Sequence, residues 1–320
     1  MVEDRQEHEL ARHVAAAGWG CGDNLSEVHL GGDGRRTWQV GHELWLTASH
    51  DAGALGRENS LLALLGSFLD ESEATFTVPT PLPTADGDLT LMFDGLGWRA
   101  TRHISGRRPD DHALDTYRQS ATTLRRLHQI LRLLPDDSAV TTSVTDQSRG
   151  LVAHVLGSEW ETVTDDPSER HDVVQMAKWL AARLDALDQV PCQLVHGDWA
   201  TPNLLMSPDD PPRIVAILDW QFARIGPTVA DLAQAASTVL MWSSFRDKNM
   251  VVQEILDFYG DGAQKQLLGV AMGAFWFWNY WRGREEVQRE PRARSAMNRQ
   301  PARLRTVLAF AREWESSVGS

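Results

Sequence analysis

Hydrophobic and polar residues alternate in short segments over the first hundred residues, a pattern that is typical of β-strands. Glycine-rich turns separate these segments, and the pattern predicts five strands, at residues 25–30, 37–40, 44–47, 89–93 and 98–104. Apolar residues at helical spacing predict helices at residues 3–17 and 58–69, and the proline-rich run at residues 78–83 is predicted to be a loop. The order therefore predicts a five-stranded antiparallel sheet with a helix between its third and fourth strands.

Helical spacing dominates the rest of the chain. Seven helices are predicted, at residues 112–134, 147–156, 170–187, 231–242, 249–259, 264–284 and 302–315. A short β-pair is predicted within residues 194–219, and the polar run at residues 136–146 is predicted to be an exposed loop. We therefore expect an α+β fold with an N-terminal sheet domain at residues 1–104 and a mainly helical domain at residues 105–320.

The balance of charge argues against nucleic acid as a main partner, because 44 acidic residues outnumber 31 basic ones and give a net charge of −13. The two cysteines, Cys21 and Cys192, imply no disulfide framework. The sequence shows no charged-then-apolar leader, and no apolar run approaches the roughly 18 residues that a membrane span needs. We expect a cytoplasmic protein without a membrane partner, either a monomer or a homodimer.

The most informative chemistry begins at His196. Asp198 is followed by Asn203 five residues later and by Asp219 sixteen residues after that. Kinases use this layout, with a carboxylate that accepts the proton of the attacking hydroxyl and two oxygen ligands that bind magnesium. Amide and carboxylate oxygens suit a hard cation such as Mg²⁺. We therefore expect Asp198 to be the catalytic base and Asn203 and Asp219 to be metal ligands. The alternative is that these are unrelated residues in turns, where Asp and Asn are common.

The segments around these residues support the kinase interpretation. A tight loop is expected after Asp198, because Pro202 disfavours helical backbone at Thr201. Residues 213–218 are enriched in β-branched side chains and predict a buried strand that ends at Asp219. A carboxylate at the end of a strand faces a cleft more often than a core.

Five stretches of the chain together carry a family resemblance. They are Arg102-His-Ile-Ser-Gly106, Leu124-Arg-Arg-Leu-His128, His196-Gly-Asp-x-x-x-x-Asn203, Ile217-Leu-Asp219-Trp220 and Gly226-Pro-Thr-Val-Ala-Asp231-Leu-Ala233. They resemble the aminoglycoside phosphotransferase and choline kinase family. The resemblance implies a two-lobed, protein-kinase-like fold that uses Mg²⁺ to transfer the γ-phosphate of ATP or GTP to a hydroxyl of a small molecule. Gly197 stands where protein kinases have an arginine that binds the phosphorylated activation loop. We therefore expect no regulation by phosphorylation of an activation loop.

The resemblance also implies a nucleotide site in the N-terminal lobe. Gly32 and Gly34 are expected in a loop over the phosphates, because glycine lets the backbone approach phosphate oxygens closely. The same residues also suit an ordinary hairpin turn. Arg102, His103 and Ile104 are expected in the connection between the lobes and in contact with the nucleotide.

One residue of the expected nucleotide site is missing. Family members usually carry a lysine at the end of the third strand, where it holds the phosphates and pairs with a helix glutamate. Thr47 falls at that position, and Glu58 matches the glutamate, so Glu58 is expected to lack its usual partner. Three explanations are open: His42, His50 or Arg57 supplies the cation; Mg²⁺ and backbone amides hold the nucleotide; or the chain is a pseudokinase.

Other polar and aromatic residues near the motifs have both structural and functional interpretations. We expect structural roles for three of them: His196 beneath the catalytic loop, His128 bracing it, and Asp231 as a helix N-cap. Thr201 and Trp199 are candidates for substrate contact. Trp278 and Trp281, from the aromatic run at residues 275–281, are candidates for the acceptor pocket, although packing between helices is the alternative.

These patterns predict a small-molecule kinase, and nothing in the catalytic motif names its acceptor. Our first expectation is an antibiotic-inactivating kinase. The second is a primary-metabolite kinase that acts on choline, homoserine or a sugar. The third is a pseudokinase that binds a nucleotide or metabolite without turnover.

Overall fold

The computed structural model describes residues 2–21, 25–28, 35–72, 74–134, 143–157, 166–289 and 300–318. They form two compact units. The first contains the described parts of Met1–Arg108, together with Leu134 and Leu204–Gln221, and the second contains the described parts of Pro109–Leu133, Val140–Asn203 and Phe222–Ser320. The domain boundary predicted at residues 104/105 stays a prediction.

The first unit is built on a six-stranded antiparallel sheet. Its strands are β1 (Leu25–Val28), β2 (Arg36–Val40), β3 (Leu44–Ser49), β4 (Pro81–Leu82), β5 (Leu91–Phe93) and β6 (Leu96–Arg102). The order is β1-β2-β3-β6-β4, and β5 also pairs with β6. Five strands confirm the sequence prediction. The prediction of a loop was wrong at Pro81–Leu82, which forms a short strand at the edge of the sheet, where a proline is tolerated.

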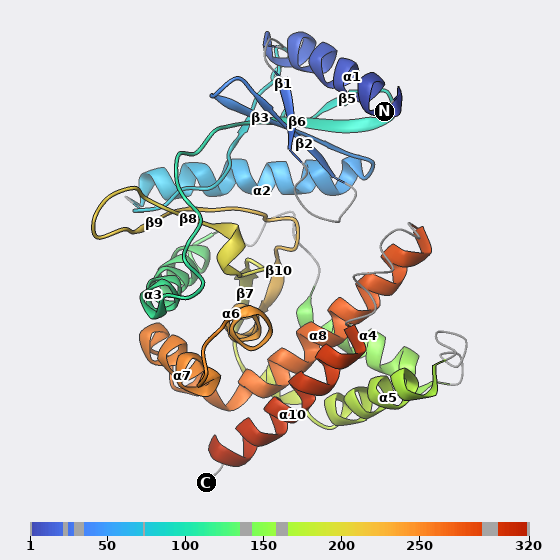
Figure 1. The fold of residues 1–320 in the computed structure, drawn as a ribbon, viewed down its shortest axis with the longest axis vertical. Coiled ribbons are helices and arrows are strands. Elements are labelled where there is room, and N and C mark those ends of the chain that lie inside the picture. Colours follow the sequence, from blue (N-terminus) through green and yellow to red (C-terminus); the bar gives the residue numbers. More distant parts are fainter. Residues whose placement is uncertain are drawn as a thin grey trace. The chain divides into compact units, whose positions relative to one another are not determined.

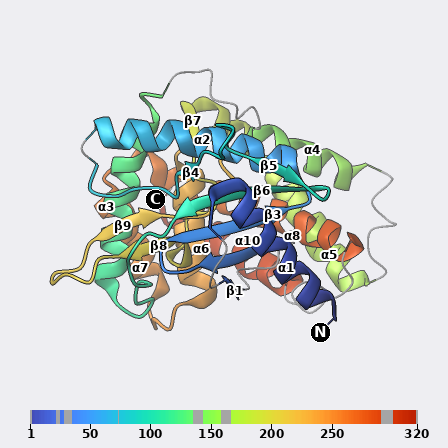
Figure 2. The same ribbon diagram turned by 90° about the horizontal axis from the view of Figure 1, so that it is seen from above.

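Two helices cover opposite faces of this sheet (Figure 1 and Figure 2). Helix α1 (Val2–Trp19) and the inward residues of β2, β3 and β6 form one hydrophobic cluster, which contains Trp38, Leu46 and Trp98. Helix α2 (Ala52–Glu71) begins at Asp51, whose side chain accepts a hydrogen bond from the Ala54 N–H. Because side chains alternate along a strand, Arg99 lies on the opposite face from Trp98, toward α2.

A second hairpin, β8 (Leu204–Met206) with β9 (Ile214–Ile217), also belongs to the first unit. An antiparallel bridge from Arg107 to Met206 and a parallel bridge from Thr77 to Ala216 attach it to the preceding chain. Gly106 is required beside this hairpin, because a Cβ there would lie 2.9 Å from the Leu205 Cβ. The predicted strand before Asp219 is confirmed.

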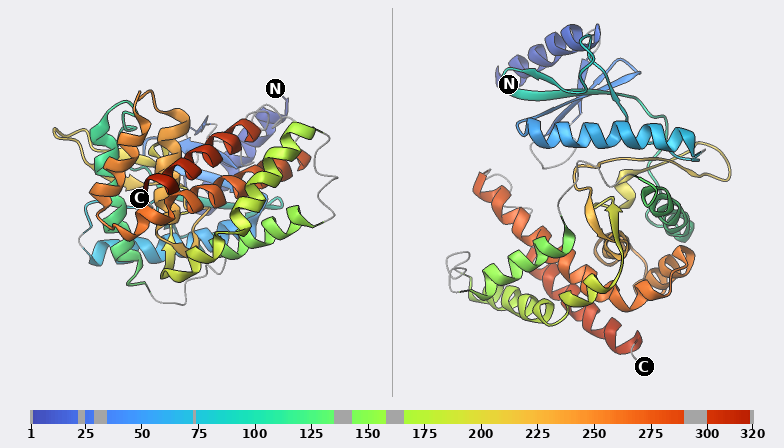
Figure 3. Two further views of the ribbon diagram at one scale, coloured as in Figure 1. Left: turned by 90° about the horizontal axis from the view of Figure 1, so that it is seen from below. Right: turned by 180° about the vertical axis from the view of Figure 1, so that it is seen from behind.

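The second unit is mainly helical. Its helices are α3 (Leu114–Leu131), α4 (Val144–Leu156), α5 (Pro167–Ala181), α6 (Val229–Trp242), α7 (Lys248–Tyr259), α8 (Ala263–Arg289) and α10 (Gln300–Val318). Helix α8 packs against α10, α6 and α4, and α4 also packs on α5 (Figure 3). All seven predicted helices are therefore present. The loop predicted at residues 136–146 falls outside the described residues as far as residue 142, and its last part begins α4 instead.

A short antiparallel pair, β7 (Cys192–Val195) with β10 (Arg224–Pro227), also belongs to the second unit, and β7 leads into the predicted catalytic loop. None of the described helices is both long and apolar enough to cross a bilayer.

Candidate active site

The loop after β7 has a backbone shape that only glycine allows at one position. Gly197 has a φ of +81°, and a Cβ at this residue would lie 1.8 Å from the carbonyl oxygen of Phe222. Both the left-handed conformation and the close approach therefore require glycine. This explains physically why the arginine of protein kinases cannot stand here.

Asp198 and Asn203 lie together in this loop. The Asn203 side-chain amide donates hydrogen bonds to the Asp198 backbone carbonyl and to Asp198 Oδ2, each at 2.9 Å. The expected tight loop is present, but the expectation of non-helical backbone at Thr201 was wrong. Residues Thr201–Asn203 form one turn of 3-10 helix, which folds the loop back so that these contacts can form. Among the described residues, no hydrogen bond reaches Asn203 Oδ1, so this oxygen can serve a cation while the amide nitrogen holds Asp198.

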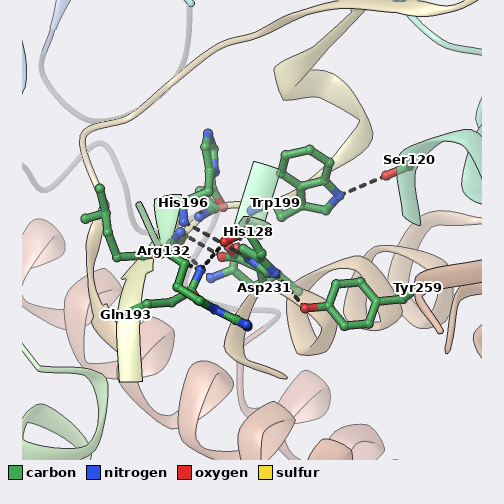
Figure 4. A network of polar contacts seen from close by, with 12 residues as sticks. Ser120, His128, Arg132, Gln193, His196, Trp199, Asp231 and Tyr259 are labelled. Atoms are coloured by element: carbon green, nitrogen blue, oxygen red, sulfur yellow. Dashed lines mark hydrogen bonds and ion pairs between the residues drawn. The ribbon is translucent and has the colours of Figure 1, made fainter. Parts of the chain in front are cut away.

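A fully buried carboxylate holds the start of the loop (Figure 4). Asp231 Oδ2 accepts the His196 N–H at 2.9 Å, and Oδ1 accepts the Gly197 N–H at 2.8 Å. The prediction that Asp231 caps its helix was wrong, because Thr228 precedes α6 and Asp231 lies inside the first turn. Its type and place suggested a cap, but its partners come from a loop 34 residues earlier.

Two histidines support Asp231. His128 Nε2 lies 2.9 Å from Asp231 Oδ2, and His128 Nδ1 lies 2.8 Å from the Tyr259 hydroxyl. His196 is buried, and its Nδ1 accepts the Asp198 N–H at 3.2 Å. The structural roles predicted for His128 and His196 are confirmed. Burial by itself raises the pKa of Asp231, but the hydrogen bond from His128 and the nearby histidines hold it below its ordinary value.

Trp199 anchors the other side of the loop. Its backbone N–H donates to the Gln234 side chain, and its indole N–H donates to Ser120 Oγ at 2.8 Å. Its side chain is only 1% exposed. Thr201 is also buried, and its hydroxyl has no hydrogen-bond partner among the described residues. This burial favours a packing role for Trp199; substrate contact by either residue stays a prediction.

Asp219 follows β9 with a left-handed backbone, at a φ of +59°. Asp94 is the other described non-glycine residue with a positive φ, and Asp and Asn are the residues that tolerate this region best. Asn203 immediately precedes Leu204, whose register partner is Ile217, two residues before Asp219. The two predicted metal ligands therefore flank the same end of the β8–β9 pairing along the chain.

Glu58 has partners that the sequence analysis did not find. Arg35 Nη1 lies 2.6 Å from Glu58 Oε2, and Arg99 Nη1 lies 2.8 Å from Glu58 Oε1. Burial alone would raise the pKa of Glu58, but the two guanidinium groups hold it below its ordinary value. Glu58 therefore lacks its usual lysine partner, as expected, but two arginines pair with it instead. Arg99 is the register partner of Thr47, which stands where the lysine was expected.

The other predicted nucleotide residues lie at the end of β6. Arg102 pairs in register with Leu44, and the His103 N–H donates to the Glu43 carbonyl at 2.6 Å. The Trp45 indole N–H donates to His103 Nδ1 at 2.9 Å. Ile104 follows and is half-buried. Gly32 and Gly34 lie outside the described residues.

An arginine and aromatic cluster lies beside the catalytic loop. Arg224 donates to the Gly197 carbonyl at 3.4 Å, and its guanidinium lies 4.2 Å from the ring centre of Trp278. Phe222 packs edge-on against the same indole. Arg282 stacks on both rings, at 4.7 Å from Phe222 and 5.4 Å from Trp278. This cluster was not predicted.

Trp281, one turn of α8 away from that cluster, lies in a different environment. It is 8% exposed and packs edge-on against His154 and Tyr280. Trp278, in contrast, is half-buried and keeps exposed surface. Both remain candidates for acceptor contact, and the contacts favour Trp278.

Asn203 and Asp219 are residue types that suit a magnesium ion, and binding of one ion by both stays a prediction. Among the described residues, no three His, Cys, Asp or Glu side chains are arranged to hold a metal. Mg²⁺ is often held by only one or two protein ligands, with water and substrate phosphates completing its octahedron. One amide oxygen and one carboxylate are therefore a chemically suitable protein contribution.

The structure has the two parts of a kinase-like small-molecule phosphotransferase. One unit is a sheet with a helix that carries Glu58, and the other is helical and carries the loop with Asp198 and Asn203. The comparisons agree: residues 25–268 match the model of the phosphotransferase enzyme family. The chain belongs to this family, and it is an enzyme of the phosphotransferase class.

Solved structures share the fold at low sequence identity. An amicoumacin kinase in complex with AMP-PNP, Ca²⁺ and Ami has a TM-score of 0.70 at 13% identity, over 95% of this chain and 96% of that chain. A microcompartment-associated aminopropanol kinase has a TM-score of 0.68 at 16% identity, over 97% of this chain and 98% of that chain. The kinase-like fold predicted from the sequence is therefore confirmed.

Curated relatives match only a small segment. Acyl-CoA dehydrogenase family member 11 from Gallus gallus is 39% identical over 61 residues, which is 19% of this chain and 8% of that protein. The chain thus covers a small fraction of the length of this relative.

Proposed function

We propose that this chain transfers the γ-phosphate of ATP or GTP to a hydroxyl of a small molecule. The observation that carries the proposal is the hydrogen-bonded pair of Asp198 and Asn203, on a loop whose backbone is held by the buried Asp231. The fold neighbour solved with AMP-PNP supports a nucleotide as the phosphate donor. Phosphoryl transfer depends mainly on positioning and charge stabilisation, and a rigid loop supplies the positioning.

In this proposal Asp198 orients the acceptor hydroxyl and accepts its proton as the hydroxyl oxygen bonds to the γ-phosphorus. The bond from that phosphorus to the β,γ-bridging oxygen breaks, and ADP or GDP leaves. Asn203 holds the Asp198 carboxylate by its amide nitrogen and offers its Oδ1 to the metal. Asp219 contributes the second oxygen ligand. When bound, Mg²⁺ would neutralise charge that develops on the phosphate oxygens.

Asp219→Asn should remove most of the stabilisation that Mg-AMP-PNP gives the protein. At a ligand concentration of 100 Kd, binding stabilises a native protein by about 2.7 kcal/mol. The matched control is Asp94→Asn, which changes the same residue type in the same left-handed backbone region. Thermal unfolding with and without Mg-AMP-PNP measures the effect. If Mg-AMP-PNP raises the unfolding temperature of the Asp219 variant as much as that of the unmodified protein, Asp219 is not a metal ligand. If it does not raise the unfolding temperature of the unmodified protein, a pseudokinase that binds nucleotide poorly is favoured.

We further propose that Arg99 replaces the missing lysine at the nucleotide phosphates. Its guanidinium is buried, pairs with Glu58 and Asn59, and leaves Nε without a partner among the described residues. Arginine can bind phosphate oxygens with two parallel hydrogen bonds.

Arg99→Ala should therefore raise the Kd of Mg-AMP-PNP at least about tenfold, equivalent to about 1.4 kcal/mol. Arg99→Lys should recover part of the affinity, because it keeps the charge. The control is Arg36→Ala, on strand β2 of the same sheet, where the arginine pairs with Glu7 near the surface. Isothermal titration measures the Kd values, and equal affinity in the Arg99→Ala and Arg36→Ala variants would contradict the assignment.

The acceptor is the open part of the function. An antibiotic is our first proposal, supported by the fold shared with the amicoumacin kinase, and a primary metabolite is the second, supported by the fold shared with the aminopropanol kinase. Resistance of a sensitive host that expresses the chain would favour the first. A screen of hydroxyl compounds for Mg-ATP consumption tests both, and it should include neutral, cationic and anionic members.

A further inference from the structure

Two guanidinium groups lie next to the catalytic loop in the second unit, and both contact Trp278. Arg224 begins β10 and reaches the Gly197 carbonyl, one residue before Asp198. Arg282 comes from α8 and stacks on Phe222 and Trp278. Two positively charged guanidinium groups therefore lie beside the Trp278 ring, at 4.2 Å and 5.4 Å from its centre.

Neither guanidinium forms an ion pair with a described residue. Arg224 donates to the Gln147 side-chain oxygen at 3.0 Å and to the Gly197 carbonyl, and Arg282 donates to the Asn279 side-chain oxygen at 3.3 Å. The Nε atoms of both are buried without a partner in the described part of the chain. Arg224 is only 6% exposed, so its unpaired donor is well removed from water.

This contrasts with other arginines of the same unit. Several pair with a carboxylate: Arg118 with Glu254, Arg149 with Asp185, Arg183 with Glu315, Arg284 with Glu169, and Arg305 with Asp172. The pairing of Arg284 is informative, because it lies two residues from Arg282 on the same helix. Among the described residues, Arg282 thus lacks the paired carboxylate that Arg284 has on the same helix.

The cluster carries unfavourable electrostatics of its own. Burial is the main cause that lowers the pKa of Arg224 to about 10; Asp231 and Asp198 oppose this shift, and the charge of Arg282 adds a smaller contribution in the same direction as burial. Two neighbouring cations repel each other, and an anion placed between them would relieve that repulsion. The aromatic surface offers apolar contact beside the same charges.

We propose that Arg282, together with Arg224 and Trp278, binds an anionic group of the acceptor, a carboxylate or a phosphate. The proposal rests on the proposed phosphotransfer function and narrows it to hydroxyl compounds that carry an oxyanion. A guanidinium matches the geometry of such a group by donating two parallel hydrogen bonds. An ammonium group at the same place would meet two like charges, so a cationic acceptor is disfavoured there.

Binding can be tested without phosphoryl transfer. Isothermal titration of the full chain with glucuronate, glucose and 6-amino-6-deoxyglucose compares a carboxylate, a neutral group and an ammonium at one position of a sugar. Glycerate, glycerol and 3-amino-1,2-propanediol repeat the comparison on a smaller frame. We expect the carboxylate member to bind at least about tenfold more tightly than its ammonium counterpart. Preferential binding of the carboxylate without any phosphoryl transfer would leave this site standing and would contradict the proposed function instead.

Arg282→Gln should abolish that preference. The matched control is Arg303→Gln, because Arg303 also stacks on indoles, those of Trp242 and Trp276, in the same unit. A second variant, Arg282→Lys, keeps the charge and should retain part of the preference. Two results would overturn the proposal: no preference for the carboxylate in the unmodified protein, or an Arg282→Gln variant that loses affinity for Mg-AMP-PNP and keeps its acceptor preference, which would assign the pair to the donor phosphates.

Discussion

Replacing Asp198 by alanine should lower turnover at least about 100-fold, the low end of what a positioned proton acceptor contributes. The fold should stay intact, because most bonds that hold the loop do not use this side chain. His196 and Gly197 bind Asp231 through their backbone N–H groups, and Trp199 binds Gln234 in the same way. The Asp198 carboxylate itself accepts one hydrogen bond, from Asn203, among the described contacts.

Two further variants make this test specific. Asp198→Asn preserves the shape of the side chain but not the ability to accept a proton, so it should lose turnover about as strongly as the alanine variant. Asp257→Ala removes an exposed carboxylate that pairs with Lys265, and it should leave turnover unchanged. Steady-state kinetics separates the expected fall in kcat from a change in KM. An Asp198→Asn variant with full kcat would show that the residue only positions the loop.

The elements of the fold could be predicted because their signals are local. The period at which apolar residues recur distinguished strands from helices. The spacing of Asp198 and Asn203 predicted a tight loop, which the structure contains. The buried roles of His128 and His196 followed from the resemblance to kinases rather than from a local pattern. Strand β4 was missed because two residues that include a proline carry no alternating pattern.

The partners of Glu58 could not be predicted from local pattern. Arg99 meets Glu58 because α2 packs on β6, and that packing is decided by contacts between residues far apart in sequence. One signal was available: Arg99 is a charged residue between the inward-facing Trp98 and Ala100 of a predicted strand. A charge in that position needs a buried partner of opposite sign, and the helix glutamate was the obvious candidate.

The arginine cluster at Trp278 illustrates the same limit. Arg224 and Arg282 are 58 residues apart, and they meet because β10 pairs with β7 while α8 packs nearby in the same unit. The sequence analysis placed Trp278 among the acceptor candidates from its aromatic run alone. The structure adds the charges around it, which is the information that narrows the class of acceptor.

Asp231→Asn should destabilise the protein by about 3 kcal/mol, because a buried, charged acceptor becomes a neutral group with two donors. The carboxylate now accepts from the backbone N–H groups of His196 and Gly197 and from His128. An asparagine amide nitrogen would face at least one of those donors. Turnover should also fall, because the loop that carries Asp198 would lose its anchor. Urea unfolding measures the free energy, and a loss within about 1 kcal/mol would contradict the anchoring role.

The control is Asp115→Asn, which changes an exposed acidic residue in the first turn of another helix, where its partner is Arg118. A surface pair of this kind contributes about 1 kcal/mol or less.

The pH dependence of stability separates the Asp231 site from the Asp115 site further. Because the folded pKa of Asp231 lies below its ordinary value, its ionised form stabilises the fold above the unfolded pKa, and that contribution is lost as pH falls through the folded pKa. The stability gap between the unmodified protein and Asp231→Asn should therefore narrow as the solution is acidified. A gap that stays constant down to the acid transition would mean that the Asp231 charge does not stabilise the loop.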